Sequence, residues 1–454
     1  MHTVADSTMR IIIAGAGDVG FHLAKLLSYE EHDIVLIDKK HDKLAHASSN
    51  IDVAIIKGNV TSFSILDDAN ISEAELFIAV TESEQTNISA AIIAKHLGAK
   101  KTVARIQNIE YLYNRDKLDL RDLGIDEIIS TESLAAREIK RLLRKTALTD
   151  IFDFEGGQLS LLGLFIDKNS ILVNKTLAEV ADLNPELNFI LVALLRDNKT
   201  IIPRGNNKFL PGDHAYFISQ PEGIERVVAL AGKQKVDIKN IMILGGSQVG
   251  YHSSKSLSKK FNVKLIEKDK DKCFELADQL PKVMVINGDG TDVEILNEEN
   301  ISEMDVFIAV TGNSETNIIS CLVAKNSGVK KTICLVENMD YIHISQNIGV
   351  DTMINKKLIA ANFIFRYIRK GEVLSLTGIH GVDAEVLEFL VKENARVVNK
   401  EIRELHFPQS SIIGGVIRNG KGYTTMGDFK FMANDRVVVL CKPDCLHQVE
   451  EFFL

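Results

Sequence analysis

The sequence predicts an α/β fold in which a two-domain unit occurs twice along the chain of 454 residues. Three observations carry this prediction. A β-branched run is followed by a glycine-rich turn at Ile11–Gly20, strand-like and helix-like segments alternate after it, and the same pattern restarts at Ile241–Gly250. A repeat of this length is too long for a solenoid and indicates a tandem duplication of domains.

The stretch Ile11–Gly20 reads I-I-I-A-G-A-G-D-V-G and has Gly15, Gly17 and Gly20 at the spacing G-x-G-x-x-G. Its apolar start predicts a short buried strand, and the apolar run after Gly20 predicts a helix. In such a strand–turn–helix, the first glycine makes the turn, the second lets a pyrophosphate approach the backbone, and the third lets helix and strand pack closely. The free N–H groups of the first helical turn then face the phosphates. This is the arrangement of a Rossmann-like nucleotide-binding domain.

The second predicted strand, Asp33–Ile37, is followed by Asp38, which stands 18 residues after Gly20. A carboxylate in this place accepts hydrogen bonds from ribose hydroxyls and repels a 2′-phosphate, so the sequence favours NAD over NADP. The alternative is a glycine turn without a ligand. That alternative accounts less well for the strand, turn, helix and acid in their full context.

Strands and helices continue to alternate as far as residue 130, which requires crossover helices and a parallel sheet. Strands are predicted at Ile51–Ile56, Leu76–Val80, Thr102–Ile106 and Ile125–Ser130, and helices at Ser62–Ala69 and Gln85–Leu97. A longer helix, Glu132–Thr146, leaves the domain, and Lys356–Lys370 is its counterpart in the second half.

After Thr149 the sequence changes to short β-like runs separated by turns, which predicts a small α+β domain of about 80 residues. The predicted strands are Leu159–Ile166, Phe189–Leu195, Thr200–Ile202 and Ala215–Ile218, and the helix Glu222–Ala231 ends the domain.

The second half repeats the first at a nearly constant offset. Gly20 corresponds to Gly250 and Thr81 to Thr311, each 230 positions on, and F-I-A-V-T stands unchanged at residues 77–81 and 307–311. The small domain repeats more loosely, with Asp213 corresponding to Asp435. We therefore expect nucleotide-binding domains at residues 9–130 and 239–355, and small α+β domains at 151–233 and 373–454.

Composition excludes several classes of protein. The net charge of −9 argues against a nucleic-acid or anionic-lipid surface. No apolar run approaches the roughly 18–20 residues that span a bilayer, and residues 1–9 lack the apolar core of a signal peptide.

The five cysteines do not pair by spacing, which is typical of reduced thiols. C-K-P-D-C-L-H at residues 441–447 lacks a second ligand pair, so we predict no metal site.

Taken together, the motifs resemble the TrkA family of Trk potassium-uptake proteins, whose chains carry two RCK units in tandem, each an N-domain and a C-domain. The resemblance covers residues 9–454. It rests on G-A-G-D-V-G, Asp38, T-E-S-E-Q-T-N from Thr81 and A-R-I-Q-N-I-E-Y from Ala104, and on G-G-S-Q-V-G, Glu267, G-D-G-T from Gly288 and T-G-N-S-E-T-N from Thr311.

This resemblance implies a regulatory subunit and not an enzyme. The subunit would lie on the cytoplasmic face of the inner membrane, beside a Trk-type potassium channel. It would bind NAD or NADH, with ATP or ADP as further ligands at one or both sites, and would couple that binding to gating. RCK units of this family form rings of eight, so a chain with two units implies a homotetramer. Protein contact, and not lipid, would recruit it.

Matched by motif, the resemblance implies a first nucleotide site of Gly15, Ala16, Gly17, Asp18, Val19, Asp38, Thr81, Glu82 and Arg105. Thr81 ends a strand at the carboxyl edge, where ligands of such sheets lie. Arg105 ends the next strand and can pair with phosphate; an interdomain salt bridge is the alternative. For Asn87 we expect a role at the start of a helix, together with Thr86.

A second site would comprise Gly245, Gly246, Ser247, Gln248, Val249, Glu267 and Asp289. Ser247 replaces the middle glycine and adds a side chain where the backbone must approach phosphate. Leu335 stands at the position of Arg105, which removes a cation. We expect this site to bind pyrophosphate compounds more weakly than the first.

Two other functions remain open at this point: an NAD-dependent oxidoreductase and a soluble NAD-binding scaffold. A dehydrogenase needs a proton-transfer group beside the nicotinamide. The histidines of the chain lie in no recognisable catalytic neighbourhood, and we assign no catalytic residue. The nucleotide fold is shared by many functions, but the tandem arrangement favours the regulatory subunit.

Overall fold

The computed structural model describes residues 9–28, 32–108, 110–114, 116–143, 148–197, 199–232, 237–338, 349–368, 373–378 and 382–453. The chain divides into two compact units. The first holds residues 1–137 together with Asn355–Phe365, and the second holds Glu138–Ile354 together with Arg366–Leu454. The ends of both predicted long helices, 144–146 and 369–370, lie outside the described residues, as does the segment 1–8.

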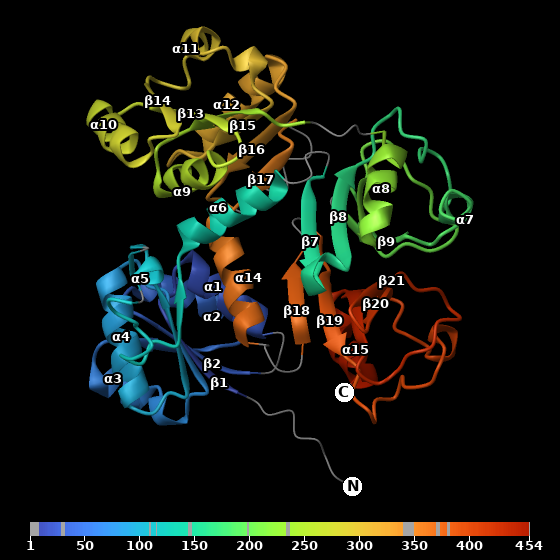
Figure 1. The fold of residues 1–454 in the computed structure, drawn as a ribbon. Helices are drawn as coiled ribbons and strands as arrows, with labels where there is room; N and C mark the ends of the chain where they lie inside the picture. Colours follow the sequence, from blue (N-terminus) through green and yellow to red (C-terminus); the bar gives the residue numbers. More distant parts are fainter. Residues whose placement is uncertain are drawn as a thin grey trace. The chain divides into compact units, whose positions relative to one another are not determined.

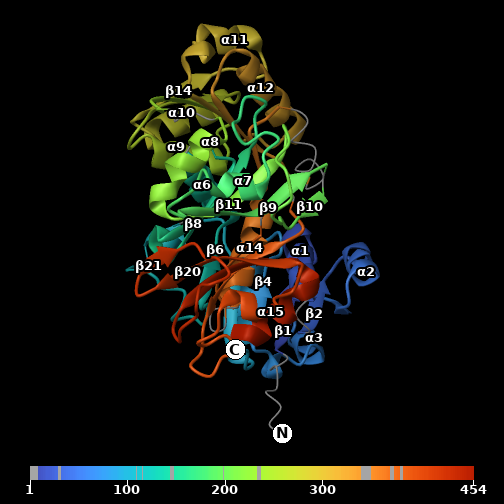
Figure 2. The same cartoon turned by 90° about the vertical axis from the view of Figure 1, so that its right-hand side faces the viewer.

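The first unit is built on a parallel six-stranded sheet in the order β3-β2-β1-β4-β5-β6 (Figures 1 and 2). We call this part of the chain the first N-domain. Its strands are β1 (Arg10–Ala14), β2 (Asp33–Asp38), β3 (Ala54–Lys57), β4 (Leu76–Ala79), β5 (Lys101–Arg105) and β6 (Glu127–Ile129). Its helices are α1 (Asp18–Ser28), α2 (His41–Asn50), α3 (Phe63–Asp68), the 3₁₀ turn η1 (Ile71–Glu73), α4 (Glu84–His96), α5 (Glu110–Tyr113) and α6 (Thr131–Leu142).

The central strand β1 explains why the sheet forms around the glycine turn. Ile11, Ile12 and Ile13 are all fully buried, as expected for a strand covered on both faces. The strand order reverses between β1 and β4, and ligands of such sheets bind at this reversal, beyond the carboxyl ends of the strands. The prediction for β3 was wrong at its start, because the strand begins at Ala54 and not at Ile51.

A second six-stranded sheet, with the order β14-β13-β12-β15-β16-β17, forms the second N-domain. Ile241 pairs with Val306 as Ile11 pairs with Leu76, so the duplication extends to strand register. The strands are β12 (Asn240–Leu244), β13 (Asn262–Glu267), β14 (Val283–Asn287), β15 (Val306–Ala309), β16 (Lys331–Leu335) and β17 (Thr352–Ile354). The helices are α9 (Gln248–Leu257), α10 (Lys270–Gln279), α11 (Val293–Glu298), η4 (Ile301–Glu303) and α12 (Ser314–Asn326). The helix α14 (Lys356–Ile368) follows β17 in the chain, and its residues as far as Phe365 belong to the first unit.

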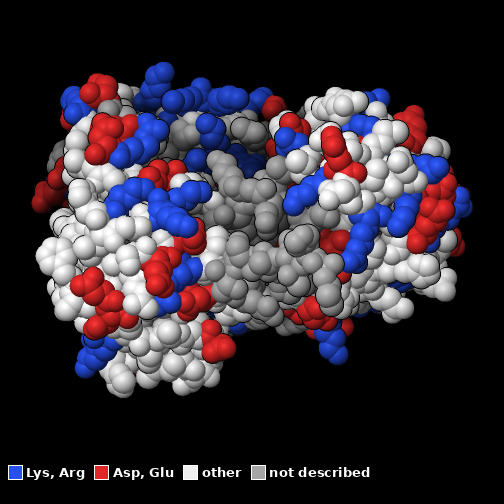
Figure 3. Space-filling view, turned by 90° about the horizontal axis from the view of Figure 1, so that it is seen from below, with Lys and Arg blue, Asp and Glu red and all other residues white. Residues whose placement is uncertain are grey.

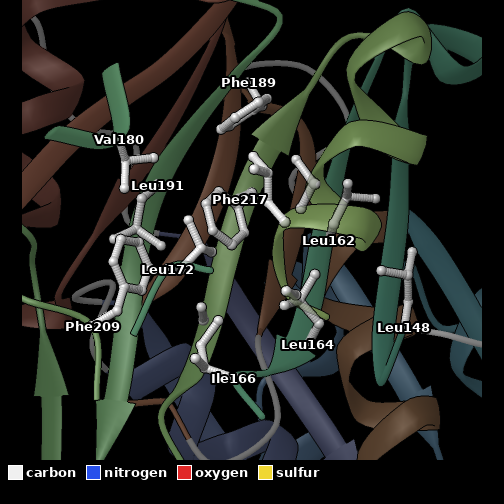
Figure 4. Packing of buried hydrophobic residues seen from close by; sticks show 14 of the residues in the cluster. Leu148, Leu162, Leu164, Ile166, Leu172, Val180, Phe189, Leu191, Phe209 and Phe217 are labelled. Atoms are coloured by element: carbon white, nitrogen blue, oxygen red, sulfur yellow. The ribbon is translucent and has the colours of Figure 1, made fainter. Parts of the chain in front are cut away.

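The first C-domain is an antiparallel sheet in the order β10-β9-β11-β8-β7 with helices beside it. Its core joins Leu162, Leu164 and Phe217 from the sheet to Phe209 and Leu172 from the connections (Figure 4). The elements are β7 (Asp150–Phe154), η2 (Glu155–Gly157), β8 (Leu159–Phe165), α7 (Leu177–Ala181), β9 (Phe189–Arg196), β10 (Lys199–Ile201), β11 (His214–Ser219), η3 (Pro221–Gly223) and α8 (Ile224–Leu230).

The second C-domain repeats this sheet as β18-β19-β22-β20-β21. Residues of both C-domain sheets, among them Leu161, Val192, Val386 and Val438, belong to one shared apolar cluster within the second unit. The elements are β18 (Val373–Gly378), β19 (Glu385–Leu390), η5 (Ile402–Glu404), β20 (Ser411–Arg418), β21 (Lys421–Tyr423), β22 (Arg436–Cys441), η6 (Pro443–Cys445) and α15 (Leu446–Phe453).

The correspondence of Asp213 with Asp435 is visible in atomic detail. Both Asp213 carboxylate oxygens accept hydrogen bonds from Arg196 at 2.7 Å, and both Asp435 oxygens accept from Arg418 at 2.7 Å. Each carboxylate also accepts from a backbone N–H group, that of Leu210 in the first copy. The C-domains are therefore copies of one fold.

One face of the described chain shows mixed charge. Acidic and basic side chains are interspersed over most of the face in Figure 3. Among the helices that the structure describes, none has both the length and the apolar character needed to cross a bilayer.

Candidate functional site

The turn after β1 has a shape that requires two of its glycines. Gly15 has φ = +114°, and a Cβ atom on it would lie 2.9 Å from the backbone nitrogen of Thr81. A Cβ atom on Gly20 would lie 1.8 Å from the carbonyl oxygen of Gly15. These close approaches place the turn against the end of β4 and start α1 directly behind it.

The middle glycine, Gly17, borders open space. A Cβ atom there would have one neighbour within 4 Å, the ammonium nitrogen of Lys43 at 3.6 Å. Apart from the chain neighbours of Gly17, no backbone atom lies within 4 Å of this position, and a cation lies beside it. This is the environment that a pyrophosphate requires.

Asp38 joins the ends of β1 and β2. Its Oδ2 accepts a hydrogen bond from the N–H group of Ala16 at 2.8 Å, and its Oδ1 accepts from the N–H group of Lys40 at 2.8 Å. The carboxylate is thereby fixed beside the glycine turn, at the sheet edge where ribose hydroxyls are bound in such folds.

The structure overturns our expectation that Asn87 acts at the start of a helix. Ser83 is the residue that caps α4, accepting a hydrogen bond from the N–H group of Thr86. Asn87 is buried and accepts from the N–H group of Thr81 at 2.8 Å, and its amide donates to the carbonyl oxygen of Arg105 at 2.9 Å. It ties the ends of β4 and β5 together and so holds Thr81 and Arg105 at one edge.

Glu82 lies at the same edge and leads to a residue that the sequence analysis missed. Its exposed carboxylate accepts a hydrogen bond from Lys43 at 2.8 Å, and this bond holds the pKa of Glu82 below its ordinary value. The repeat contained a clue to Lys43. It follows Asp38 by five positions, just as Lys272 follows Glu267 by five, and Lys272 lies 3.3 Å from the Glu267 carboxylate.

Arg105 is mostly buried at the end of β5. Its Nη2 lies 4.0 Å from an oxygen of the buried Glu132 carboxylate, within the first unit. Its Nε is buried and has no hydrogen-bond partner among the described residues. A buried guanidinium donor without a partner at the ligand edge of the sheet is suited to an anionic ligand.

The remaining residues of the first site, Asp18 and Val19, begin α1. Val19 is buried in the core, so only its backbone can contact a ligand. The exposed Asp18 carboxylate lies 2.5 Å from the ammonium of Lys357, at the start of α14. The structure thus brings the residues expected for the first site to one edge of one sheet.

The second turn has the same backbone. Gly245 has φ = +103°, and Glu267 accepts hydrogen bonds from the N–H groups of Gly246 at 2.8 Å and Asp269 at 3.0 Å. Burial raises the pKa of Glu267, but these hydrogen bonds and Lys272 outweigh it, so the pKa lies below its ordinary value.

The differences from the first site lie at three residues. The hydroxyl of Ser247 donates to the carbonyl oxygen of Val310 at 2.7 Å and also caps α9, whose first residues are Gln248 and Val249. Leu335 is buried and supplies no charge. Asp289 pairs with Lys268 at 2.8 Å, and hydrogen bonds from Lys268 and Thr291 hold its pKa at about 2.

These groups suit the binding of a nucleotide. Backbone N–H groups, an acid at the end of the second strand and nearby cations match the diphosphate and ribose of a nucleotide. Within the described part of the chain, no cluster of three His, Cys, Asp or Glu side chains could hold a metal ion.

Comparison with known proteins places this geometry in a family. The TrkA-N domain family matches residues 11–131 and 241–356, and the TrkA-C domain family matches residues 161–232 and 386–454.

Curated relatives match over nearly the whole chain. A Trk system potassium uptake protein TrkA homolog of Archaeoglobus fulgidus is 32% identical over 446 residues, covering 98% of this chain and 100% of the relative. Trk system potassium uptake protein TrkA of Haemophilus influenzae is 31% identical over 452 residues, covering 98% of each.

Among solved structures, the GsuK channel bound to NAD has a similar fold, with a TM-score of 0.58 at 14% identity, covering 99% of this chain and 79% of that one. The duplicated N- and C-domains, the two glycine turns and these full-length matches agree. The chain belongs to the TrkA family of Trk system potassium uptake proteins.

Proposed function

We propose that this protein is the regulatory subunit of a Trk-type potassium-uptake system and that nucleotide binding to its N-domains controls potassium transport. The observation that carries the proposal is the occurrence of two glycine turns of the same shape in a chain that matches Trk relatives over its full length. The domain boundaries 9–130, 151–233, 239–355 and 373–454 are part of this proposal.

The nucleotide of the first site is NAD or NADH, and ATP or ADP competes for one or both sites. Asp38 beside the turn favours a ligand with a free ribose 2′-hydroxyl. Lys43 and Arg105 supply cations for the diphosphate. A similar fold is seen in the GsuK channel bound to NAD, which supports a nicotinamide nucleotide here.

The partner is the membrane subunit that conducts potassium, and the protein acts from the cytoplasmic side as a homotetramer. Two nucleotides with different contacts to the N-domains would stabilise different arrangements of the assembly. Only such a difference in affinity can shift the equilibrium of the channel. No hydride transfer is part of this function.

The direct test is potassium flux into liposomes that contain a Trk-type membrane subunit, with the purified chain and NAD, NADH, ATP or ADP added. We expect at least two of these nucleotides to change the flux in opposite directions or to different extents. Gly17→Asp adds bulk and charge at the turn and should abolish the effect of the first site. Gly205→Asp adds the same charge at an open turn and is the matched control.

Three results would contradict the proposal. A flux that does not depend on the chain would rule out the partner. A monomer at micromolar concentration in light scattering would rule out the tetramer. Oxidation of NADH coupled to reduction of a metabolite would favour an oxidoreductase.

A further inference from the structure

Part of the first unit comes from the second half of the chain. Asn355–Phe365 packs with residues 1–137, although more than 200 residues separate the two segments (Figure 1). Ala360, Ala361 and Ile364 of this segment are fully buried. Arg137 lies over the ring of Phe363 at 5.9 Å. The first part of α14 is therefore packed into the core of the first unit.

The start of α14 is fixed independently of its lysine side chains. Asn355 is fully buried, and its side-chain oxygen accepts hydrogen bonds from the N–H groups of Lys357 at 2.9 Å and Leu358 at 3.0 Å. Such a cap sets the position of the first helical turn. A change of the Lys357 side chain should therefore leave the backbone of this turn in place.

Lys357 reaches the glycine turn of the first site. Its ammonium lies 2.5 Å from the carboxylate of Asp18, the residue between Gly17 and Val19 and the first of α1. Its side chain is about three-quarters buried, with 24% exposed, whereas the side chain of Asp18 is 69% exposed. The cation is held in place, and its acidic partner faces solvent at the N-terminus of the helix.

The charge of Asp18 opposes the phosphates that this helix terminus would otherwise attract. Lys357 neutralises that charge. A second lysine, Lys356, lies 3.9 Å from the Glu132 carboxylate, which also faces Arg105 at 4.0 Å. The start of α14 thus adds positive charge to the edge that carries the first site.

We propose that Lys357 is a residue of the first nucleotide site, where it neutralises Asp18 and donates a hydrogen bond to a phosphate of the bound nucleotide. This inference rests on the proposed function, because it assumes a nucleotide at the Gly15 turn. Nucleotide binding and the docking of α14 then stabilise each other by equal free energies. The affinity of the first site for its nucleotide therefore depends on the position of α14, a helix that follows the second N-domain in the chain.

The test uses the full chain carrying Ser247→Asp, which adds charge to the second turn while keeping a good helix cap. ADP and adenosine are titrated calorimetrically, since only ADP carries phosphates. Lys357→Gln should weaken ADP binding about tenfold, the size expected for loss of a charged hydrogen bond, and should leave adenosine binding unchanged. Lys357→Arg should retain most of the ADP affinity.

Two further variants sharpen the result. Lys95→Gln breaks a comparable 2.8 Å ion pair with Asp126 in the same domain, at the amino ends of the strands, and should leave both affinities unchanged. Asp18→Asn should tighten ADP binding in the presence of Lys357. The gain from Asp18→Asn should be larger in the Lys357→Gln background, because Lys357 then no longer neutralises the Asp18 charge and the two side chains are coupled.

The outcomes separate the two proposals. The proposed nucleotide function fails if the Ser247→Asp protein binds none of NAD, NADH and ADP. It also fails if adding Gly17→Asp to that protein leaves the binding of these nucleotides unchanged. In either case this inference fails with it. If ADP binds at the Gly15 turn but Lys357→Gln leaves its affinity unchanged, Lys357 only anchors α14. If adenosine and ADP weaken equally, the effect comes through the fold and this inference is overturned.

Discussion

The buried ammonium group of Lys331 donates a hydrogen bond to the main-chain carbonyl oxygen of Leu148. Lys331 begins β16 in the second N-domain, and Leu148 precedes the first strand of the first C-domain. Its counterpart in the first N-domain, Lys101, is exposed. The same residue type at matching positions thus has opposite environments in the two halves.

This burial makes stability depend on pH. Burial lowers the pKa of Lys331 from 10.5 to about 8, even though the nearby acids Asp351 and Asp150 favour its charge. Between these two values the unfolded chain binds more protons than the folded chain, so the free energy of unfolding should increase with pH. Between the two pKa values, Lys331 raises the free energy of unfolding by up to about 1.4 kcal/mol per pH unit. Below the pKa of the folded protein, Lys331 adds no dependence on pH.

Urea unfolding across this pH range measures the effect. Lys331→Met removes the titrating group and should flatten the increase relative to the wild type. Lys101→Met removes the exposed counterpart and should not change the slope. Equal slopes for all three proteins would show that burial does not shift the protonation of Lys331.

Asp38→Ala should weaken NAD binding at the first site by about tenfold, because it removes a charged acceptor and leaves the N–H groups of Ala16 and Lys40 without their partner. Calorimetric titration measures the affinity, and thermal unfolding measures the local cost. Asp126→Ala is the control, since it removes an acceptor for the N–H group of Thr102 at the amino ends of the strands. Asp126→Ala should lower the stability of the protein and leave its affinity for NAD unchanged. If Asp126→Ala also weakened NAD binding, the first site would be responding to general destabilisation.

The two sites should differ in affinity. Gly17→Asp blocks the first turn and leaves the second, while Ser247→Asp does the reverse. We expect the second site to bind NAD or ADP about tenfold more weakly, because the buried Leu335 cannot supply the charged hydrogen bond available from Arg105. Titration of each variant measures one site alone, and equal affinities would refute the predicted asymmetry.

The duplicated ion pairs of the C-domains should contribute similarly to stability. Asp213→Ala and Asp435→Ala each leave a partly buried arginine without the two hydrogen bonds that it donates to the carboxylate, at a cost of about 3 kcal/mol. Glu451→Ala breaks the exposed pair with Arg396 and should cost less than about 1 kcal/mol. Chemical unfolding of the three variants makes this comparison. A cost for Asp435 no larger than that for Glu451 would contradict it.

Local sequence was enough to predict the N-domain sheets, because their central strands are continuous apolar runs that end in glycine turns. It was not enough for β7, where Asp150 and Asp153 interrupt the apolar pattern of a strand that is partly exposed. The role of Asn87 was missed for a different reason. Its partners at Thr81 and Arg105 lie on two other elements, and only the folded sheet brings them together.

The same limit applies to the site. Asp38 and the glycines lie on consecutive elements, so their proximity follows from the order of strand, turn and helix. Lys43 could have been found by aligning the two halves, since Lys272 occupies the matching place. Lys357 could not, because it is more than 300 positions from Asp18 and nothing local to either residue links them.

The contribution of Asn355–Phe365 to the first unit also constrains the order in which the protein can be completed. A ribosome adding about 5–20 residues per second needs roughly 10–40 s to proceed from Arg137 to Asn355. During that time the nascent first unit lacks the apolar residues of α14 and exposes the surface that they will cover. Chaperones that bind exposed apolar surface would therefore meet this intermediate during synthesis, and a message truncated before Asn355 would yield a first unit that cannot be completed.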